Sequence, residues 1–212
     1  MRIFIVGSDN SIFNNNERFK SRLIDYSSII DGLTIVVPYR QSKKISLNGK
    51  ILYCGSGGSN KLSQFLRLTI LSFKLLSSNK FDVISSQDPY FFGLLSMVLS
   101  KIFHIGFAVQ IHGFEKFYGL RKFIAKFVIP RADSVRVVSL RLRKEMIEDF
   151  GVNSHIITVV PIFSDLLSIE PLPIRDNGNF IFLTISRLVD VKNIPLQIKA
   201  FNNFVSHNTN SE

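Results

Sequence analysis

The chain has 212 residues, of which 46% are hydrophobic and 20% are charged. This composition excludes a disordered polypeptide and provides core material for one large domain, or for one domain and part of a second. The 26 Lys and Arg residues outnumber the 16 Asp and Glu, and the net charge of +10 favours an anionic partner: nucleic acid, a phosphate-bearing substrate or an acidic membrane surface.

Short apolar runs alternate with longer segments of helical periodicity from residue 2 to about residue 160. The runs are rich in Ile, Val and Phe without strict alternation, which is typical of a sheet covered on both faces. We therefore predict an α/β fold, a Rossmann-like doubly wound parallel sheet with helices on both faces. The seven predicted strands are residues 3–6, 33–37, 51–53, 82–85, 107–111, 134–138 and 156–160.

Two segments show the helical pattern most clearly. Between residues 62 and 76, apolar side chains recur close to the i, i+3, i+4, i+7 spacing of a helix. A second helix is predicted to begin after Ser139, whose hydroxyl suits the N-cap position. Its predicted buried stripe is Leu142, Met146 and Phe150.

A boundary is predicted at residues 164–178, which hold two prolines and lead into an Asp-Asn-Gly turn signal. We assign residues 1–163 to the first domain and residues 179–212 to the start of a second. That start reads as a buried strand at 180–185, a polar turn that carries Arg187 and Lys192, and an amphipathic helix from about Asn193.

Four sequence stretches, taken in their order and spacing along the chain, indicate a family: HGFE at 112–115, ADSVRVVS at 132–139, VVPIFSD at 159–165 and ISRLVDVKN at 185–193. Together they resemble the family 4 retaining glycosyltransferases of the GT-B architecture, in which two Rossmann-like domains face each other across a cleft. By this resemblance the first domain binds the acceptor and the second binds the nucleotide sugar. The chain corresponds to about half of a typical member. We therefore expect a truncated enzyme, a fragment or half of a split enzyme, with little activity alone.

The resemblance implies a hexosyl-type transferase that moves a sugar from a nucleotide-diphosphate sugar to a glycan or lipid-linked acceptor, as in polysaccharide biosynthesis. The resemblance also implies that Arg187 and Lys192 bind the diphosphate of the donor. Their setting agrees, since a strand-to-helix turn favours an anion and a guanidinium with an ammonium makes a clamp. The alternative is that both are ordinary solvated loop residues. No cofactor is implied, and because no His, Cys or Asp cluster has metal-ligand spacing, we predict no metal site.

His112 follows a predicted strand at the carboxyl edge of the sheet, where such folds bind ligands. We predict it as the catalytic residue, because an imidazole there can donate to a sugar hydroxyl or share a proton. Gly7, Glu115 and Ser139 are further cleft candidates, with Gly7 allowing a tight turn after the first strand. The alternatives are a strand-end histidine bonded to a loop carbonyl and a serine that only caps its helix.

Basic residues concentrate in two stretches, 60–80 and 101–144, which also carry apolar helical faces. Such helices can lie on an anionic bilayer, or they can be internal helices with a solvated basic edge. The longest charge-free apolar stretch, residues 89–100, is far shorter than the ~20 residues of a spanning helix.

The single cysteine, Cys54, fits a reducing compartment. We therefore expect a cytoplasmic protein, peripheral on the inner membrane face. The alternative function is a non-catalytic module that binds an acceptor or a membrane. Nucleic acid is not an expected partner, since no helix-turn-helix, zinc finger or RNP pattern is present.

Overall fold

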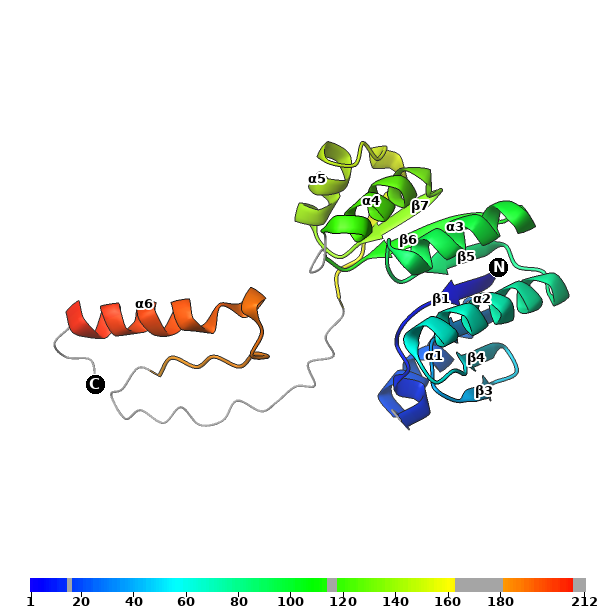
Figure 1. Ribbon diagram of the computed structural model, residues 1–212, viewed down its shortest axis with the longest axis horizontal. Helices are drawn as coiled ribbons and strands as arrows, with labels where there is room; N and C mark the ends of the chain where they lie inside the picture. The colour runs from blue at the N-terminus through cyan, green and yellow to red at the C-terminus, as the bar shows by residue number, and fades with distance from the viewer. Residues whose placement is uncertain (15–16, 114–117, 163–180, 208–212) are drawn as a thin grey trace. The chain divides into compact units, whose positions relative to one another are not determined.

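The computed structural model describes residues 1–14, 17–113, 118–162 and 181–207, and the chain divides into two compact units, Met1–Phe163 and Ser164–Glu212 (Figure 1). Unit 1 is an α/β domain built on one sheet. The described part of unit 2 contains one long helix. The predicted linker, residues 164–178, lies outside the described residues.

An eight-stranded sheet forms the centre of unit 1, in the order β3-β4-β2-β1-β5-β6-β7-β8. All neighbouring pairs are parallel except β3 with β4. The seven strands predicted from the sequence are all present, so the predicted parallel sheet is confirmed. The strands are β1 Arg2–Val6, β2 Gly32–Val37, β3 Ser42–Leu47, β4 Ile51–Ser56, β5 Val83–Ser86, β6 Gly106–Ile111, β7 Ser134–Val137 and β8 Ile157–Val159.

Strand β3 was not predicted. It runs antiparallel to β4 at the edge of the sheet, and its sequence, SKKISL, is too polar for the apolar pattern that identifies the other strands. The signal that marks it is the Asn48-Gly49 dipeptide, a common turn between antiparallel strands because both residues tolerate positive φ. Asn48 and Gly49 adopt φ of 49° and 65°, and the Lys50 N–H donates to the Leu47 carbonyl at 3.2 Å.

Helices pack on both faces of this sheet, which confirms the doubly wound architecture (Figure 1). One face carries α1 and the short 3-10 helix η1 over β1, β2 and β4. The opposite face carries the four helices that follow. The bounds are η1 Ser11–Asn14, α1 Glu17–Tyr26, α2 Lys61–Ser78, α3 Phe91–Phe103, α4 Gly119–Val128 and α5 Leu140–Glu148.

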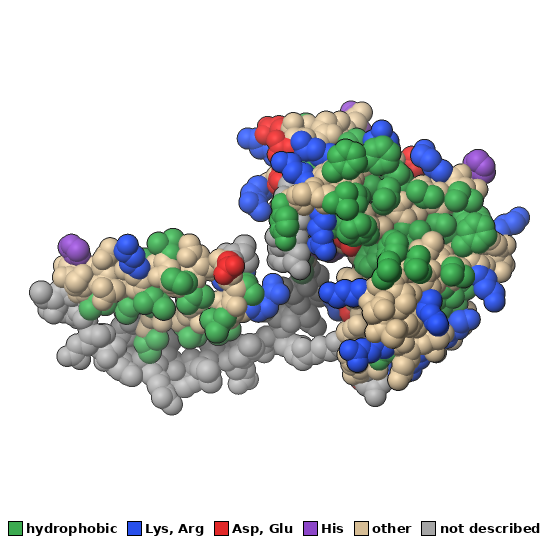
Figure 2. Space-filling model, in the orientation of Figure 1, with side chains coloured by type: hydrophobic (Ala, Val, Ile, Leu, Met, Phe, Trp, Pro, Cys, Tyr) green, Lys and Arg blue, Asp and Glu red, His purple; other side chains and the backbone are tan. Residues whose placement is uncertain are grey.

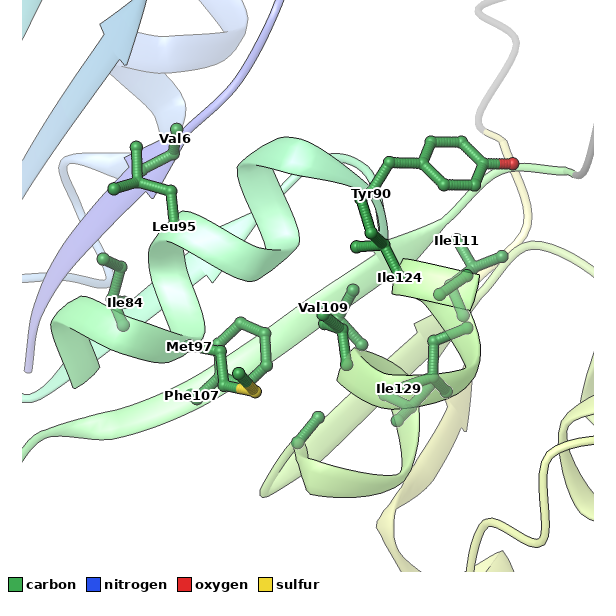
Figure 3. Packing of buried hydrophobic residues seen from close by; sticks show 14 of the residues in the cluster. Val6, Ile84, Tyr90, Leu95, Met97, Phe107, Val109, Ile111, Ile124 and Ile129 are labelled. Carbon is green, nitrogen blue, oxygen red and sulfur yellow. The ribbon is translucent and has the colours of Figure 1, made fainter. Parts of the chain in front are cut away.

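The larger core lies between the sheet and α2–α5 (Figure 3). Strand β6 shows how it is built: Phe107, Val109 and Ile111 alternate with less buried residues, and all three are almost fully inaccessible. They pack among side chains such as Met97 of α3 and Ile124 of α4. Each such side chain contributes about 1.5–3 kcal/mol of transfer free energy, so this face holds the domain together.

Only part of the apolar stripe that predicts α2 packs in the core: Leu76 is buried and Phe65 is partly buried against it. The buried residues of α2 are Leu68, Ser72 and Leu76. Four members of the stripe, Leu62, Leu66, Ile70 and Phe73, are exposed instead. Because α2 is apolar around most of its circumference, its periodicity indicates a helix without identifying which side is buried.

Unit 2 differs from the prediction. Residues 181–187 form no strand, and the predicted strand at 180–185 is therefore wrong for its described part; Phe180 lies outside the described residues. A strand needs a hydrogen-bonded neighbour, and the described part of unit 2 contains no second strand to supply one. The predicted helix is present as α6, Ile194–His207, and Phe182 packs on Phe201 and Phe204 at ring distances of 5.3 and 5.8 Å.

Candidate functional site

The carboxyl ends of β1, β5 and β6 lie side by side, because these three strands are neighbours in the sheet. Gly7 follows β1, Gln87 follows β5 and His112 follows β6. This is the edge at which open α/β sheets bind ligands. The structure thus brings two predicted site residues, Gly7 and His112, to one region around an unpredicted residue, Gln87.

Gly7 is close to the Gln87 side chain. The Gln87 N–H donates to the Val6 carbonyl at 3.0 Å, and its Oε1 accepts from the Ser8 N–H at 3.2 Å. A Cβ on residue 7 would lie only 2.1 Å from that Oε1. Gly7 does not adopt a positive φ, so the glycine serves close packing of the Gln87 amide against the first strand rather than the predicted freedom in the turn.

A pocket of about 320 Å³ opens beside this amide. Its floor includes the half-buried Asp88, whose Oδ1 accepts the Tyr90 N–H at 2.7 Å at the start of α3. Burial raises the pKa of the Asp88 carboxyl, while the Tyr90 N–H and the Arg121 charge oppose the rise. The lining residues are Gln87, Asp88, Pro89, Tyr90, His112, Gly113 and Arg121.

Arg121 supplies the positive charge of this pocket. Its guanidinium carbon lies 5.4 Å from the centre of the Tyr90 ring, within the range of a cation–π contact. The residue is half-buried in the first turn of α4. The pocket therefore presents a cation, an imidazole and an amide together, a set that suits hydroxyl and phosphate groups.

His112 lies at the mouth of the pocket and is exposed overall. Desolvation of its ring lowers the pKa of His112, and the positive charge of Arg136 lowers it further. At neutral pH the imidazole is therefore uncharged, and it can both donate and accept a hydrogen bond. A neutral imidazole suits a sugar hydroxyl better than it suits an anion.

Arg136 belongs to a chain of polar side chains across three strands. Its Nη1 donates to Gln110 Oε1 at 3.1 Å, and Gln110 Nε2 donates to Ser85 Oγ at 3.1 Å. The buried Arg136 Nε has no hydrogen-bond partner among the described residues. This chain holds a positive charge close enough to His112 to influence its proton affinity.

The other unit 1 candidates have different outcomes. Ser139 is the N-cap of α5 and accepts the Leu142 N–H at 3.2 Å, as predicted, but it does not line the pocket. Leu142, Met146 and Phe150 are buried, as predicted. Glu115 lies outside the described residues, so its cleft role stays a prediction.

Arg187 and Lys192 lie on one turn of unit 2, before α6. The 3-10 helix Asp190–Lys192 ends at Asn193 with φ of 45°, and the Lys192 carbonyl accepts from Gln197 Nε2 at 2.8 Å. A hollow of about 460 Å³ beside the turn is mostly apolar, and neither basic residue lines it. Both residues therefore precede α6 in the chain, and their role in binding a diphosphate stays a prediction.

Sequence reasoning missed three residues around His112. Gln87 and Asp88 follow a predicted strand just as His112 does, so the strand-end rule that selects His112 would have selected them too. Arg121 carried no such signal, because its place in the pocket depends on how α4 packs against α3. In the described part of the chain, no three His, Cys, Asp or Glu side chains form a group that could hold a metal ion.

A sequence model of Glycosyltransferase Family 4 matches residues 49–166, more than half of the chain, and this segment contains every residue that lines the pocket. No curated protein matches the chain significantly.

Solved structures share the fold at low identity. The apo lipopolysaccharide outer core galactosyltransferase WaaB is 19% identical with a TM-score of 0.56, over 83% of this chain and 50% of that one. The Methanocaldococcus jannaschii UDP-GlcNAc 2-epimerase, solved with UDP-GlcNAc and UDP, is 14% identical with a TM-score of 0.53, over 76% and 46%. A glycosyltransferase from Rickettsia africae is 15% identical with a TM-score of 0.51, over 76% and 42%. The chain thus spans about half the length of these proteins.

Proposed function

The chain belongs to glycosyltransferase family 4, and from this membership we propose that it takes part in transferring a hexosyl group from a nucleotide-diphosphate sugar to a glycan or lipid-linked acceptor. The observation that carries the proposal is the match over residues 49–166, because that segment includes the whole pocket around His112. A structural neighbour that binds UDP-GlcNAc and UDP supports a nucleoside-diphosphate sugar as the donor class.

The reaction exchanges one bond for another. The bond from the anomeric carbon to the diphosphate oxygen breaks, its electron pair leaves with the diphosphate, and an acceptor oxygen bonds to the carbon and gives up its proton. Catalysis of this kind needs positioning and stabilisation of the leaving charge rather than a resident metal, and no metal enters the proposal. Retention of the anomeric configuration follows from the family resemblance.

We propose that Arg187 and Lys192 bind the diphosphate leaving group and stabilise its negative charge. Both residues precede α6 in the chain. The amino end of a helix favours an anion, and a guanidinium with an ammonium adds charge-assisted hydrogen bonds. His112, whose lowered pKa favours the neutral imidazole, contacts a hydroxyl of the donor sugar. Arg121 and Gln87, which line the same pocket, then bind the acceptor.

An acceptor carried on a lipid requires work at a membrane surface, and the proposal includes peripheral attachment to the cytoplasmic face. The described helices include none long and apolar enough to cross a bilayer.

Calorimetric titration of the full chain with a panel of nucleoside-diphosphate sugars tests the proposal. One of them should bind, and Arg187→Ala with Lys192→Ala should weaken it roughly ten- to a hundredfold. A control is Lys199→Ala, which removes one positive charge from an exposed position on α6 and is compared with Lys192→Ala alone. Absence of binding by every sugar nucleotide, or equal losses in the control, would overturn the proposed donor site. His112→Ala should lower transfer to acceptor more than donor affinity.

A further inference from the structure

Helices α2, α3 and α4 cover one face of the sheet, and their outer sides turn apolar side chains to solvent (Figure 2). We call this surface the apolar helix face. We propose that it docks on an anionic lipid bilayer. The inference rests on the proposed function, because a lipid-linked acceptor would require the enzyme to bind a membrane. Lipid binding itself can be measured without catalytic turnover.

Helix α2 contributes the longest part of the face. Leu62, Leu66, Ile70 and Phe73 are all exposed, at 69%, 55%, 68% and 48% of their surface. They recur at helical spacing over residues 62–73, which is a row about 16 Å long at 1.5 Å per residue. A row of four large apolar side chains exceeds the scattered exposure that is normal for a soluble surface.

The row continues onto the neighbouring helices. The Phe73 ring of α2 lies 5.2 Å from the Phe103 ring of α3, so the two helices are in side-chain contact, and α3 exposes Val98 and Ile102 beside this seam. Helix α3 also packs against α4.

On α4, Leu120, Phe123 and Phe127 recur at i, i+3 and i+7 and are exposed, with Phe123 at 72%. The face is therefore one surface made by three helices, and Figure 2 shows hydrophobic side chains gathered over them.

The charge of the face selects its partner. There are three basic residues in α2, one in α3 and three in α4, and none of these helices contains Asp or Glu. Arg131, just after α4, lies over the Phe127 ring at 3.9 Å. Apolar side chains on helices that carry cations and no acids match a bilayer whose headgroups are anionic, since the rings enter the interface while the cations meet the phosphates.

A second copy of the chain fits this face less well. In a two-fold dimer the same patch meets itself, so Lys122 and Lys126 of one copy would approach the cations of the other with no acid on these helices to compensate. Charge complementarity therefore favours the lipid surface over self-association.

Co-sedimentation of the full chain with vesicles tests the inference. Vesicles of phosphatidylcholine with phosphatidylglycerol should bind the chain at low salt, and phosphatidylcholine alone should bind it much more weakly. Ile70→Asp should reduce binding at least about tenfold, since it places a carboxylate in the buried part of the contact. The matched control is Ile29→Asp, the same change at a site 76% exposed but remote from the face, which should leave binding unchanged.

A second pair of variants tests the charge. Lys122→Gln with Lys126→Gln should reduce binding to the anionic vesicles about tenfold. Lys43→Gln with Lys44→Gln makes the same change in net charge on β3 and should have little effect. Equal losses in the two pairs, or equal binding to neutral and anionic vesicles, would overturn the inference. So would a lipid-free dimer, seen by sedimentation equilibrium, that Ile70→Asp dissociates.

Donor binding by the same preparations, measured without lipid, separates this inference from the proposed function. A chain that binds a sugar nucleotide but no vesicle overturns the membrane surface alone. A chain that binds vesicles but no sugar nucleotide overturns the donor assignment alone. Circular dichroism spectra that match the unsubstituted chain confirm that the variants are folded.

Discussion

The segment from β7 to α5 and the segment 181–207 have the same sequence pattern, an apolar run followed by a polar turn and an amphipathic helix. In unit 1 the run becomes a strand, with Val135 and Val137 fully buried between β6 and β8. In the described part of unit 2 the run forms no strand, and Ile181 and Ile185 are 78% and 87% exposed. A helix satisfies its own backbone hydrogen bonds, whereas a strand depends on neighbours that are distant in sequence.

The largest expected effect compares two phenylalanines. Phe107→Ala should lower the free energy of unfolding of unit 1 by about 3–5 kcal/mol, because it empties a space in a closed core. Phe182→Ala should change that free energy by less than about 0.5 kcal/mol, since Phe182 belongs to unit 2 and is 59% exposed. Urea unfolding followed by circular dichroism measures both, and comparable losses would show that the two units do not differ as described.

A smaller loss of stability is expected at the carboxyl end of β1, beside the pocket. Gly7→Ala should destabilise unit 1 by about 1–3 kcal/mol, because the new methyl group displaces the Gln87 amide and breaks its bond to the Ser8 N–H. In a Gln87→Ala background the same change should cost less than about 0.5 kcal/mol. A double-mutant cycle by urea unfolding gives both values. An unchanged cost without Gln87 would exclude close packing against this amide as the reason for the glycine.

The cap of α5 gives a third comparison. Ser139→Ala should cost about 1 kcal/mol, because it leaves the Leu142 N–H without its acceptor. Ser134→Ala, the same substitution at an exposed position of β7, should stay within about 0.5 kcal/mol of the unsubstituted chain. Thermal unfolding of the two variants measures the difference. Equal shifts of the unfolding midpoint in both variants would exclude loss of the helix cap as the cause of the destabilisation.

The smallest effect concerns the proton affinity of His112. Arg136→Gln should raise the pKa of His112 part of the way towards 6.5, because the charge of Arg136 is the second cause of the lowering and desolvation is the first. An NMR titration of the imidazole measures this, with Lys43→Gln as a control for net charge. A His112 pKa unchanged by Arg136→Gln would exclude the influence of Arg136.

The lowered pKa of His112 also affects stability. As the pH falls below about 6.5, an unfolded chain binds the proton before the folded one does. The contribution of this group to stability is therefore complete above that pH and declines as the pH falls towards the lower, folded pKa. His112→Gln should flatten this part of the pH profile of unfolding.

Features that depend on local sequence were predictable. The apolar run before His112 identifies β6, and Ser139 identifies the start of α5. Features that depend on distant residues were not. The pairing of Gln110 with Arg136 requires the register of β6 against β7, and the position of Arg121 requires the packing of α4. The wrong strand at 180–185 has the same origin, since its apolar pattern is local while strand pairing is not.

The edge strand β3 has a consequence for the behaviour of the protein at high concentration. A sheet edge exposes backbone groups to which another chain can add, and this is a route to aggregation. Lys43 and Lys44 are consecutive on β3, so their side chains leave opposite faces of the strand, and both are exposed. An incoming strand would bring its backbone against charge on both sides. At the other edge, β8 pairs over only three residues, which leaves little length for such addition. The sheet is thereby protected at both ends against growth into a larger assembly.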